Sequence, residues 1–296
     1  MLESRPEVAT SPPPDTAEAA PTATDATTEP AAAEAPTAEA PAAQEAVDAP
    51  APEGAATPEL APEQSSLAAP PPPPRGLTYA VDIVFCIDVT GSMTPILDQV
   101  KANALRFYGD VQSNLTAKGK HIDELRVRVV AFRDIVADGE ASVQESPFFE
   151  LPGEQAGFSE FVNGLVPEGG GDAPESGLEA TALAMTSPWT TRGDRRRQVI
   201  VVWTDQPAHP LDPTALPAAF SSRIPADFSA LTDLWEDPQG PLGSSSKRLI
   251  LFAPDGPGWS DISGVWENVV HNPSQAGAGL SDIDYGTIID SIGNSV

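Results

Sequence analysis

The segment Thr78 to Asp88, TYAVDIVFCID, constrains the fold more strongly than any other part of this 296-residue chain. It is a continuous run of β-branched and apolar residues that ends abruptly on an aspartate. Such a run is typical of a strand that is buried on both faces of a parallel sheet. A strand of this kind needs helices on both sides, so the segment predicts an α/β domain.

Further apolar runs along the chain predict the other strands of this sheet. The strongest are at 125–132, 197–205 and 247–255, and shorter ones are at 146–152, where we expect an edge strand, and at 266–270. Helical patterns separate them, so the connections should be right-handed crossovers. The sequence therefore predicts a Rossmann-like, doubly wound and mostly parallel sheet with helices on both faces.

Apolar residues at steps of three and four predict the helices. We expect one amphipathic helix after the first strand, a short helix near 157–165, a helix that carries Leu178, and helical pieces between 215 and 235. At the end of the chain Ser281 and Asp284 are placed like a capping pair for a last helix. The residues of the first helix that should face the core are Ile96, Val100, Ala104, Phe107 and Val111.

Residues 1–76 differ sharply in composition from the rest of the chain. They contain 17 of the 33 prolines and 13 acidic side chains against two basic ones, and the first aromatic residue is Tyr79. So little apolar surface cannot offset the entropy of ordering the chain, which predicts a disordered acidic tail. Its last part, Ala69 to Gly76, should be a stiff polyproline spacer or a ligand for a proline-binding module. Residues 77–296 then form the folded domain.

Charge and cysteine content exclude several classes of protein. The net charge is −27, of which the domain carries −16, so neither nucleic acid nor an anionic membrane is the expected partner. The single cysteine, Cys86, should be a buried thiol in a strand. The sequence has no apolar signal core and no membrane-spanning run, so we expect a cytoplasmic protein with no membrane insertion.

Oxygen-bearing side chains follow two of the predicted strands. Asp88, Thr90 and Ser92 alternate along one turn, and Asp205 ends the strand at 197–205. The carboxyl ends of parallel strands share one edge of the sheet, where ligands bind in doubly wound folds. Hard oxygen ligands without imidazole or thiolate select Mg²⁺, Mn²⁺ or Ca²⁺. The alternative is an ordinary polar loop after a strand.

Three motifs in this order resemble those of von Willebrand factor A (vWA) domains. DVTGSM (88–93) is similar to their metal-ion-dependent adhesion site, GGGDAPES (169–176) stands where the family has a glycine-rich ligand loop, and WTDQPAHP (203–210) is similar to their strand-ending aspartate. The resemblance covers about residues 79–296. It implies a divalent cation held by Asp88, Thr90, Ser92 and Asp205, with Asp172 nearby. It also implies a bacterial, intracellular scaffold in complexes with ATPases, kinases or phosphatases.

Asp172 departs from the family, in which many members have threonine at this position. A third carboxylate would neutralise the cation further and weaken its attraction for a partner carboxylate. Asp172 could bind the metal directly or through water, or it could cap the helix expected to begin near Pro174 and Glu175. Glu175 itself is a first-turn helix residue or a ligand, and His209 makes a structural bond or touches a partner.

The leading hypothesis is a non-catalytic module that binds a protein partner by letting the metal accept an Asp or Glu side chain. The alternative is a Mg²⁺-dependent phosphotransfer enzyme or receiver-like domain that uses Asp88. Such sites usually add a lysine or arginine, and none of the four lysines follows a predicted strand end. A third reading is a degenerate domain that folds without metal and binds through its helices.

Overall fold

The computed structural model describes residues 77–169 and 173–296, and all structural statements concern these ranges. The predicted tail (1–76) lies outside them. The described chain forms a sheet in the order β3-β2-β1-β5-β6-β7, with β4 also paired to β2. The strands are β1 (Tyr79–Asp88), β2 (Glu124–Phe132), β3 (Val143–Glu145), β4 (Phe149–Leu151), β5 (Arg195–Trp203), β6 (Lys247–Pro254) and β7 (Val269–Ser274).

The sheet is mostly parallel, as the sequence predicts. β1 pairs in parallel with β2 and β5, and β6 continues the parallel sheet between β5 and β7. Only the short β3 and β4 run antiparallel to β2. The expected edge strand at 146–152 is therefore β4, and β3 is a second short partner of β2 that the sequence analysis missed because its three residues have no clear pattern.

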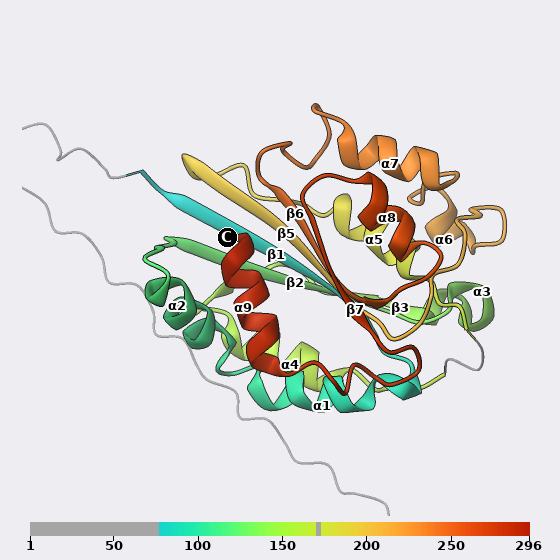
Figure 1. The fold of residues 1–296 in the computed structure, drawn as a ribbon, viewed down its shortest axis with the longest axis horizontal. Helices are drawn as coiled ribbons and strands as arrows, with labels where there is room; N and C mark the ends of the chain where they lie inside the picture. Colours follow the sequence, from blue (N-terminus) through green and yellow to red (C-terminus); the bar gives the residue numbers. More distant parts are fainter. Residues whose placement is uncertain (1–76, 170–172) are drawn as a thin grey trace, which may run out of the picture. The chain divides into compact units, whose positions relative to one another are not determined.

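Helices cover both faces of the sheet (Figure 1). The figure shows α1, α2, α4 and α9 on one face and α5, α6, α7 and α8 on the other. Alternation along β1 divides its side chains between two cores: Phe85 packs beneath the first group, and Val84 and Cys86 pack beneath the second. Cys86 is fully buried, as expected, and this burial raises the pKa of its thiol far above the usual range.

The helices match the predicted periodicity with three differences. The expected first helix is two helices, because the chain turns at residues 104–106. Two helices, at Ile135–Asp138 and at Trp259–Val265, were not predicted, since the first has only four residues and the second is short and contains two serines and a glycine. The bounds are α1 (Thr94–Asn103), α2 (Phe107–Ala117), α3 (Ile135–Asp138), α4 (Gln155–Gly164), α5 (Gly177–Met185), α6 (Ala218–Ser221), α7 (Phe228–Glu236), α8 (Trp259–Val265) and α9 (Tyr285–Ser295).

The third difference is the start of α9, which falls four residues after Ser281. Asp284 occupies the N-cap position, and its side chain accepts a hydrogen bond from the backbone N–H of Thr287. Ile288, Ile289 and Ile292 face the core, as predicted. In the described ranges, no helix is both long enough and apolar enough to cross a membrane.

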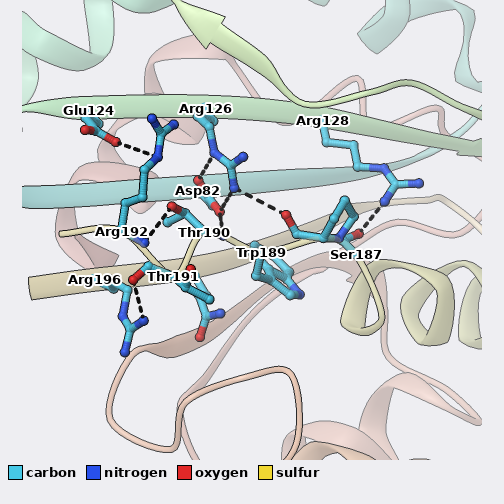
Figure 2. Close-up of polar contacts among 12 residues, drawn as sticks. Asp82, Glu124, Arg126, Arg128, Ser187, Trp189, Thr190, Thr191, Arg192 and Arg196 are labelled. Carbon is cyan, nitrogen blue, oxygen red and sulfur yellow. Dashed lines mark hydrogen bonds and ion pairs between the residues drawn. The ribbon is translucent and has the colours of Figure 1, made fainter.

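A buried polar network fastens the beginning of β1 to its neighbours (Figure 2). Asp82 is fully buried and accepts hydrogen bonds from Arg126 Nε (2.8 Å) and Nη2 (2.5 Å) and from the backbone N–H of Thr190 (2.6 Å). The bond with Asp82 raises the pKa of the Arg126 guanidinium. The network ties β1, β2 and the chain before β5 together far from the strand ends that carry the candidate ligands.

Replacing Asp82 with alanine is expected to destabilise the domain by about 2–3 kcal/mol. Removal of one member of a buried ion pair leaves the other without compensation, although Arg126 keeps some access to water. Urea unfolding of the variant measures the loss. Asp233→Ala, on the exposed face of α7, is the matched control and should change stability little. Equal stabilities for the two variants would show that the network is dispensable.

Candidate functional site

The carboxyl ends of β1 and β5 bring the predicted ligand residues together. β1 ends at Asp88, and its neighbour Ile87 is in register with Trp203 at the end of β5. Asp205 follows two residues later, so it lies just beyond the strand rather than in it. Both carboxylates are fully buried at the same edge of the sheet. The structure therefore shows the expected convergence of these two side chains.

Both carboxylate oxygens of Asp88 accept hydrogen bonds from uncharged donors. Oδ1 accepts hydrogen bonds from the backbone N–H (2.9 Å) and the hydroxyl (2.7 Å) of Thr90. Oδ2 accepts one from the hydroxyl of Thr204 (2.7 Å). Burial raises the pKa of Asp88 to about 6; its hydrogen bonds oppose this shift, and the nearby Asp205 adds to it. Among the described residues, no lysine or arginine forms an ion pair with this buried carboxylate.

Ser92 connects the two halves of the site. Its hydroxyl donates a hydrogen bond to Asp205 Oδ1 (2.9 Å), and its oxygen lies 3.4 Å from the hydroxyl oxygen of Thr90. The two residues lie at the turn Thr90–Met93, which leads from β1 into α1. Thr90 is buried, but Ser92 and Gly91 are exposed. The two hydroxyls therefore both contact carboxylates, and of the two residues only Ser92 is exposed to solvent.

The loop before α9 also contributes hydrogen bonds to the site, and this contribution was not predicted from the sequence. The backbone N–H of Gly279 donates to Asp205 Oδ2 (2.7 Å), and that of Gly277 donates to the Asp205 carbonyl (2.8 Å). Gly279 has a φ of +60°, and a Cβ there would lie 2.0 Å from the carbonyl oxygen of Ser92. The only sequence signal is the GAG triplet at 277–279, which cannot be linked to Asp205 without the fold. Thr204 was also missed, although it directly precedes Asp205.

The described part of the glycine-rich loop reaches the same edge. Glu168 donates its backbone N–H to the carbonyl of Val89 (3.0 Å), and the carbonyl of Gly169 lies near the position of a Cβ on Gly91. Asp172 lies outside the described residues, so its role stays a prediction. The following helix begins at Gly177 with Ser176 at its N-cap position, later than the expected start near Pro174 and Glu175.

His209 and Glu175 take part in hydrogen bonds that join two segments beside the site. His209 Nε2 lies 3.3 Å from Asp134 Oδ2, and the same carboxylate caps α3 through its other oxygen. The backbone N–H of His209 donates to the carbonyl of Glu175, and the N–H of Glu175 donates to the carbonyl of Pro207. These bonds join the segment before α5 to the loop after β5, which agrees with the structural reading of His209.

The residues present at this edge fit a hard divalent cation. The hydroxyls of Thr90 and Ser92 give their protons to carboxylates and keep lone pairs on oxygen for an ion. Two neighbouring ligands of an octahedral Mg²⁺ are about 3 Å apart, close to the spacing of these two oxygens. The two buried carboxylates, which form no ion pair within the described residues, would compensate the positive charge of the ion.

The carboxylate count at the site is small. Within residues 77–169 and 173–296, no group of three or more His, Cys, Asp or Glu side chains is placed to hold a metal ion. The fit therefore rests on two carboxylates and two hydroxyls. Such a set leaves positions on an octahedral cation for water and for an outside ligand.

A further acid, Glu179, lies buried in α5 and had no place in the sequence analysis. Its side chain is 1% exposed, and its Oε2 atom has no hydrogen-bond partner in the described part of the chain. Burial raises its pKa to about 7, and the nearby Asp134 adds to the shift. In the folded state Glu179 therefore binds a proton that the unfolded chain releases at its ordinary pKa of 4.5.

Glu179→Gln is expected to stabilise the domain at pH 8 by about 2–3 kcal/mol and to change stability little at pH 4. Because the folded pKa is raised, the wild type loses stability as the pH rises from 4.5 through 7, and glutamine removes this loss. Urea unfolding at both pH values measures the difference. The control Glu160→Gln, on the exposed face of α4, should show no such pH dependence. A stability gain that is equal at both pH values would contradict the assignment.

Comparison with known proteins gives partial matches. No protein-family model matches the chain. The chain is 27% identical over 130 residues to the alpha-protein kinase vwkA of Dictyostelium discoideum, a match that covers 44% of this chain and 19% of that protein. The chain therefore spans about a fifth of the length of this curated relative.

Among the solved structures that match part of the chain are proteins of bacterial pili. The vWF domain of the type V pili tip protein Mfa5 from Porphyromonas gingivalis has a TM-score of 0.32 at 21% identity, covering 49% of this chain and 44% of that chain. The PilB minor pilin from Streptococcus sanguinis has a TM-score of 0.43 at 14% identity, covering 75% and 62%. The domain itself is a doubly wound, mostly parallel sheet in which β1 ends on Asp88 and Asp205 lies just beyond β5.

Proposed function

We propose that the domain is a cation-dependent protein-binding module. A divalent cation, Mg²⁺ or alternatively Mn²⁺ or Ca²⁺, would be held by Thr90, Ser92 and the two carboxylates Asp88 and Asp205, with Asp172 as a further direct or water-mediated ligand. The observation that carries the proposal is the shared edge, where two buried carboxylates take hydrogen bonds from hydroxyls that keep lone pairs for an ion. An Asp or Glu side chain of a protein partner would complete the coordination.

The exposure of the turn after β1 supports a partner ligand rather than a closed structural site. Ser92 and Gly91 are exposed, whereas the carboxylates beneath them are fully buried. A cation at this depth would have protein oxygens below it and solvent above it. A partner carboxylate could therefore replace bound water without moving the protein ligands. We further propose that the partners belong to complexes with ATPases, kinases or phosphatases and that the protein is cytoplasmic.

The geometry favours binding over phosphotransfer at Asp88. Both carboxylate oxygens already accept hydrogen bonds, and the side chain has no exposed surface, so a phosphoryl donor could not approach it without rearrangement. In the described ranges, no lysine or arginine forms an ion pair with Asp88 or Asp205. Phosphotransfer sites use such a cation to stabilise the transferred charge.

A pull-down from native lysate tests the proposal. Wild type and Asp88→Ala serve as bait, each with Mg²⁺ and with EDTA. We expect partners that bind wild type in Mg²⁺ and are lost both with EDTA and with the variant. Asp98→Ala, an exposed aspartate on α1, is the control and should retain them. Partners that persist in EDTA and with Asp88→Ala would exclude the metal bridge. Labelling of Asp88 by a phosphoryl donor would favour the receiver alternative.

A further inference from the structure

A second cleft lies at the opposite end of the sheet, where β1 and β5 begin. It has a volume of about 730 Å³ and is lined by Tyr79, Lys120, His121, Arg195, Arg197 and Ser245, among others. β1 runs from Tyr79 to Asp88, which separates the cleft from the candidate metal edge by about 30 Å. The two places are therefore distinct, and one ligand of ordinary size cannot touch both.

Alternation along β5 explains why arginines gather in this cleft. Val199 and Val201 face the core beneath α9, so Arg195 and Arg197 lie on the same face of the strand. Tyr79, at the start of the neighbouring β1, pairs in register with Arg195, whose guanidinium lies 6.0 Å from the centre of the tyrosine ring. The RRR run at 195–197 therefore supplies two cations to the cleft from one strand.

These cations lack the carboxylate partners that most other cations of the domain have. Arg126, Arg128 and Arg133 each form an ion pair. By contrast, Arg195, Arg197 and Lys120 have no carboxylate within 4.0 Å in the described part of the chain.

The bonds that these cations do make leave much of their donor capacity free. Arg197 Nη1 donates to the carbonyl of Ser245 (2.9 Å), and Lys120 Nζ donates to the carbonyl of Gly293 (2.9 Å). The Nε atom of Arg197 is buried without a hydrogen-bond partner among the described residues. Asp194, which lines the cleft, accepts bonds from the backbone and hydroxyl of Thr78. Val296 lines it as well; its backbone oxygen accepts a hydrogen bond from the Tyr79 hydroxyl (2.8 Å), and its carboxylate forms no ion pair with these cations within the described residues.

The cations of this cleft also repel one another. Burial lowers the pKa of Lys120, and the nearby Lys118 and Arg197 lower it further. Burial and Arg197 likewise lower the pKa of Arg248, which follows the first residue of β6. Like charges held together without a counterion cost free energy. In a domain with a net charge of −16, carboxylates to neutralise them would have been easy to supply, so an outside anion is the natural counterion.

We propose that this cleft binds a small molecule that carries at least two linked phosphate groups. Guanidinium forks match phosphate oxygens two at a time, and the volume fits a ligand the size of a nucleotide. A long polyanion such as nucleic acid would also meet the rest of a domain whose net charge is −16, which disfavours it. The phosphate groups would pair with Arg195, Arg197 and Lys120, and the Tyr79 ring would offer a face for an attached base.

Calorimetric titration of the full chain with tripolyphosphate tests this proposal. EDTA is present throughout, so that binding at the metal edge cannot contribute. We expect saturable binding to wild type, with a Kd raised about tenfold in Arg195→Gln and further in the double variant with Arg197→Gln. Arg106→Gln removes an exposed charge at the start of α2, outside the cleft, and should bind as wild type does. Thermal unfolding checks that each variant is folded, and the exposed Arg195 can be replaced without loss of packing.

Titrations with three further ligands define the chemical class of molecule that the cleft binds. ATP that binds at least as tightly as tripolyphosphate would identify a nucleotide, and weaker ATP binding would identify an inorganic or non-nucleotide polyphosphate. An oligoglutamate peptide and a single-stranded oligonucleotide should both bind more weakly than tripolyphosphate. Tighter binding of either would overturn the assignment to a small phosphate ligand. No detectable binding of tripolyphosphate, or equal binding by wild type and the double variant, would overturn the site itself.

Discussion

Asp88→Asn is expected to lower the affinity for Mg²⁺ about 100-fold while stabilising the metal-free protein by about 1–2 kcal/mol. The two effects have opposite signs because the buried carboxylate serves the cation and not the fold. Its pKa is raised from 3.8 to about 6, so keeping it ionised at neutral pH costs stability when no cation is present. Asparagine removes this cost but also removes the negative charge that the ion requires.

Two measurements on the same preparation check this prediction. Calorimetric titration with Mg²⁺ gives the affinity, and urea unfolding in EDTA gives the stability of the metal-free state. Asp98→Asn, on the exposed face of α1, should leave both quantities unchanged. Unchanged Mg²⁺ affinity in Asp88→Asn would remove this residue from the ligand set. A loss of stability in EDTA would show instead that the Asp88 carboxylate stabilises the fold through Thr90 and Thr204.

Gly279→Ala is expected to destabilise the domain by about 4 kcal/mol and to weaken metal binding as well. Part of the cost is the left-handed backbone, since φ is +60°. The larger part is steric, because the new Cβ would lie 2.0 Å from the carbonyl oxygen of Ser92 and something must shift. The shift would pull the Gly279 N–H away from Asp205 Oδ2 and leave a buried carboxylate oxygen without that donor.

Gly277→Ala is the matched control for this substitution. Gly277 has a similar φ of +71°, but no heavy atom lies within 4 Å of the position of its Cβ. Its replacement should therefore cost only about 1 kcal/mol, the price of the backbone conformation alone. Urea unfolding compares the two variants. If they lost the same stability, the close approach of Gly279 to Ser92 would not be important for the fold.

The two candidate sites divide the sheet by charge. The carboxyl ends of β1 and β5 carry buried aspartates. The amino ends of the same strands carry Tyr79 and arginines that form no ion pair within the described residues. A cation at one end and a phosphate at the other would each neutralise charge that the fold leaves uncompensated. The titration in EDTA and the Mg²⁺ titration of Asp88→Asn address the two ends separately, so failure at one end does not decide the other.

The sequence by itself determined the longer strands, the class of the fold and the oxygen-bearing side chains that meet at the candidate metal edge. Long β-branched runs such as 79–88 can hardly be anything but buried parallel strands, because their apolar residues need cover on both faces. Asp88 and Asp205 could be paired across more than a hundred residues, since parallel strands end at one edge. Short elements without a periodic pattern, such as β3 and α8, could not be found in this way.

Only the tertiary structure decided what surrounds these ligands. The contacts of Gly279 with Asp205 and Ser92, and of Thr204 with Asp88, join segments that no local pattern connects. The same is true of the basic cleft, in which Lys120, Arg195 and Tyr79 come from three separate parts of the chain. Local periodicity reports which face of an element is buried, but long-range packing sets which polar atoms meet there and which charges are left without a partner.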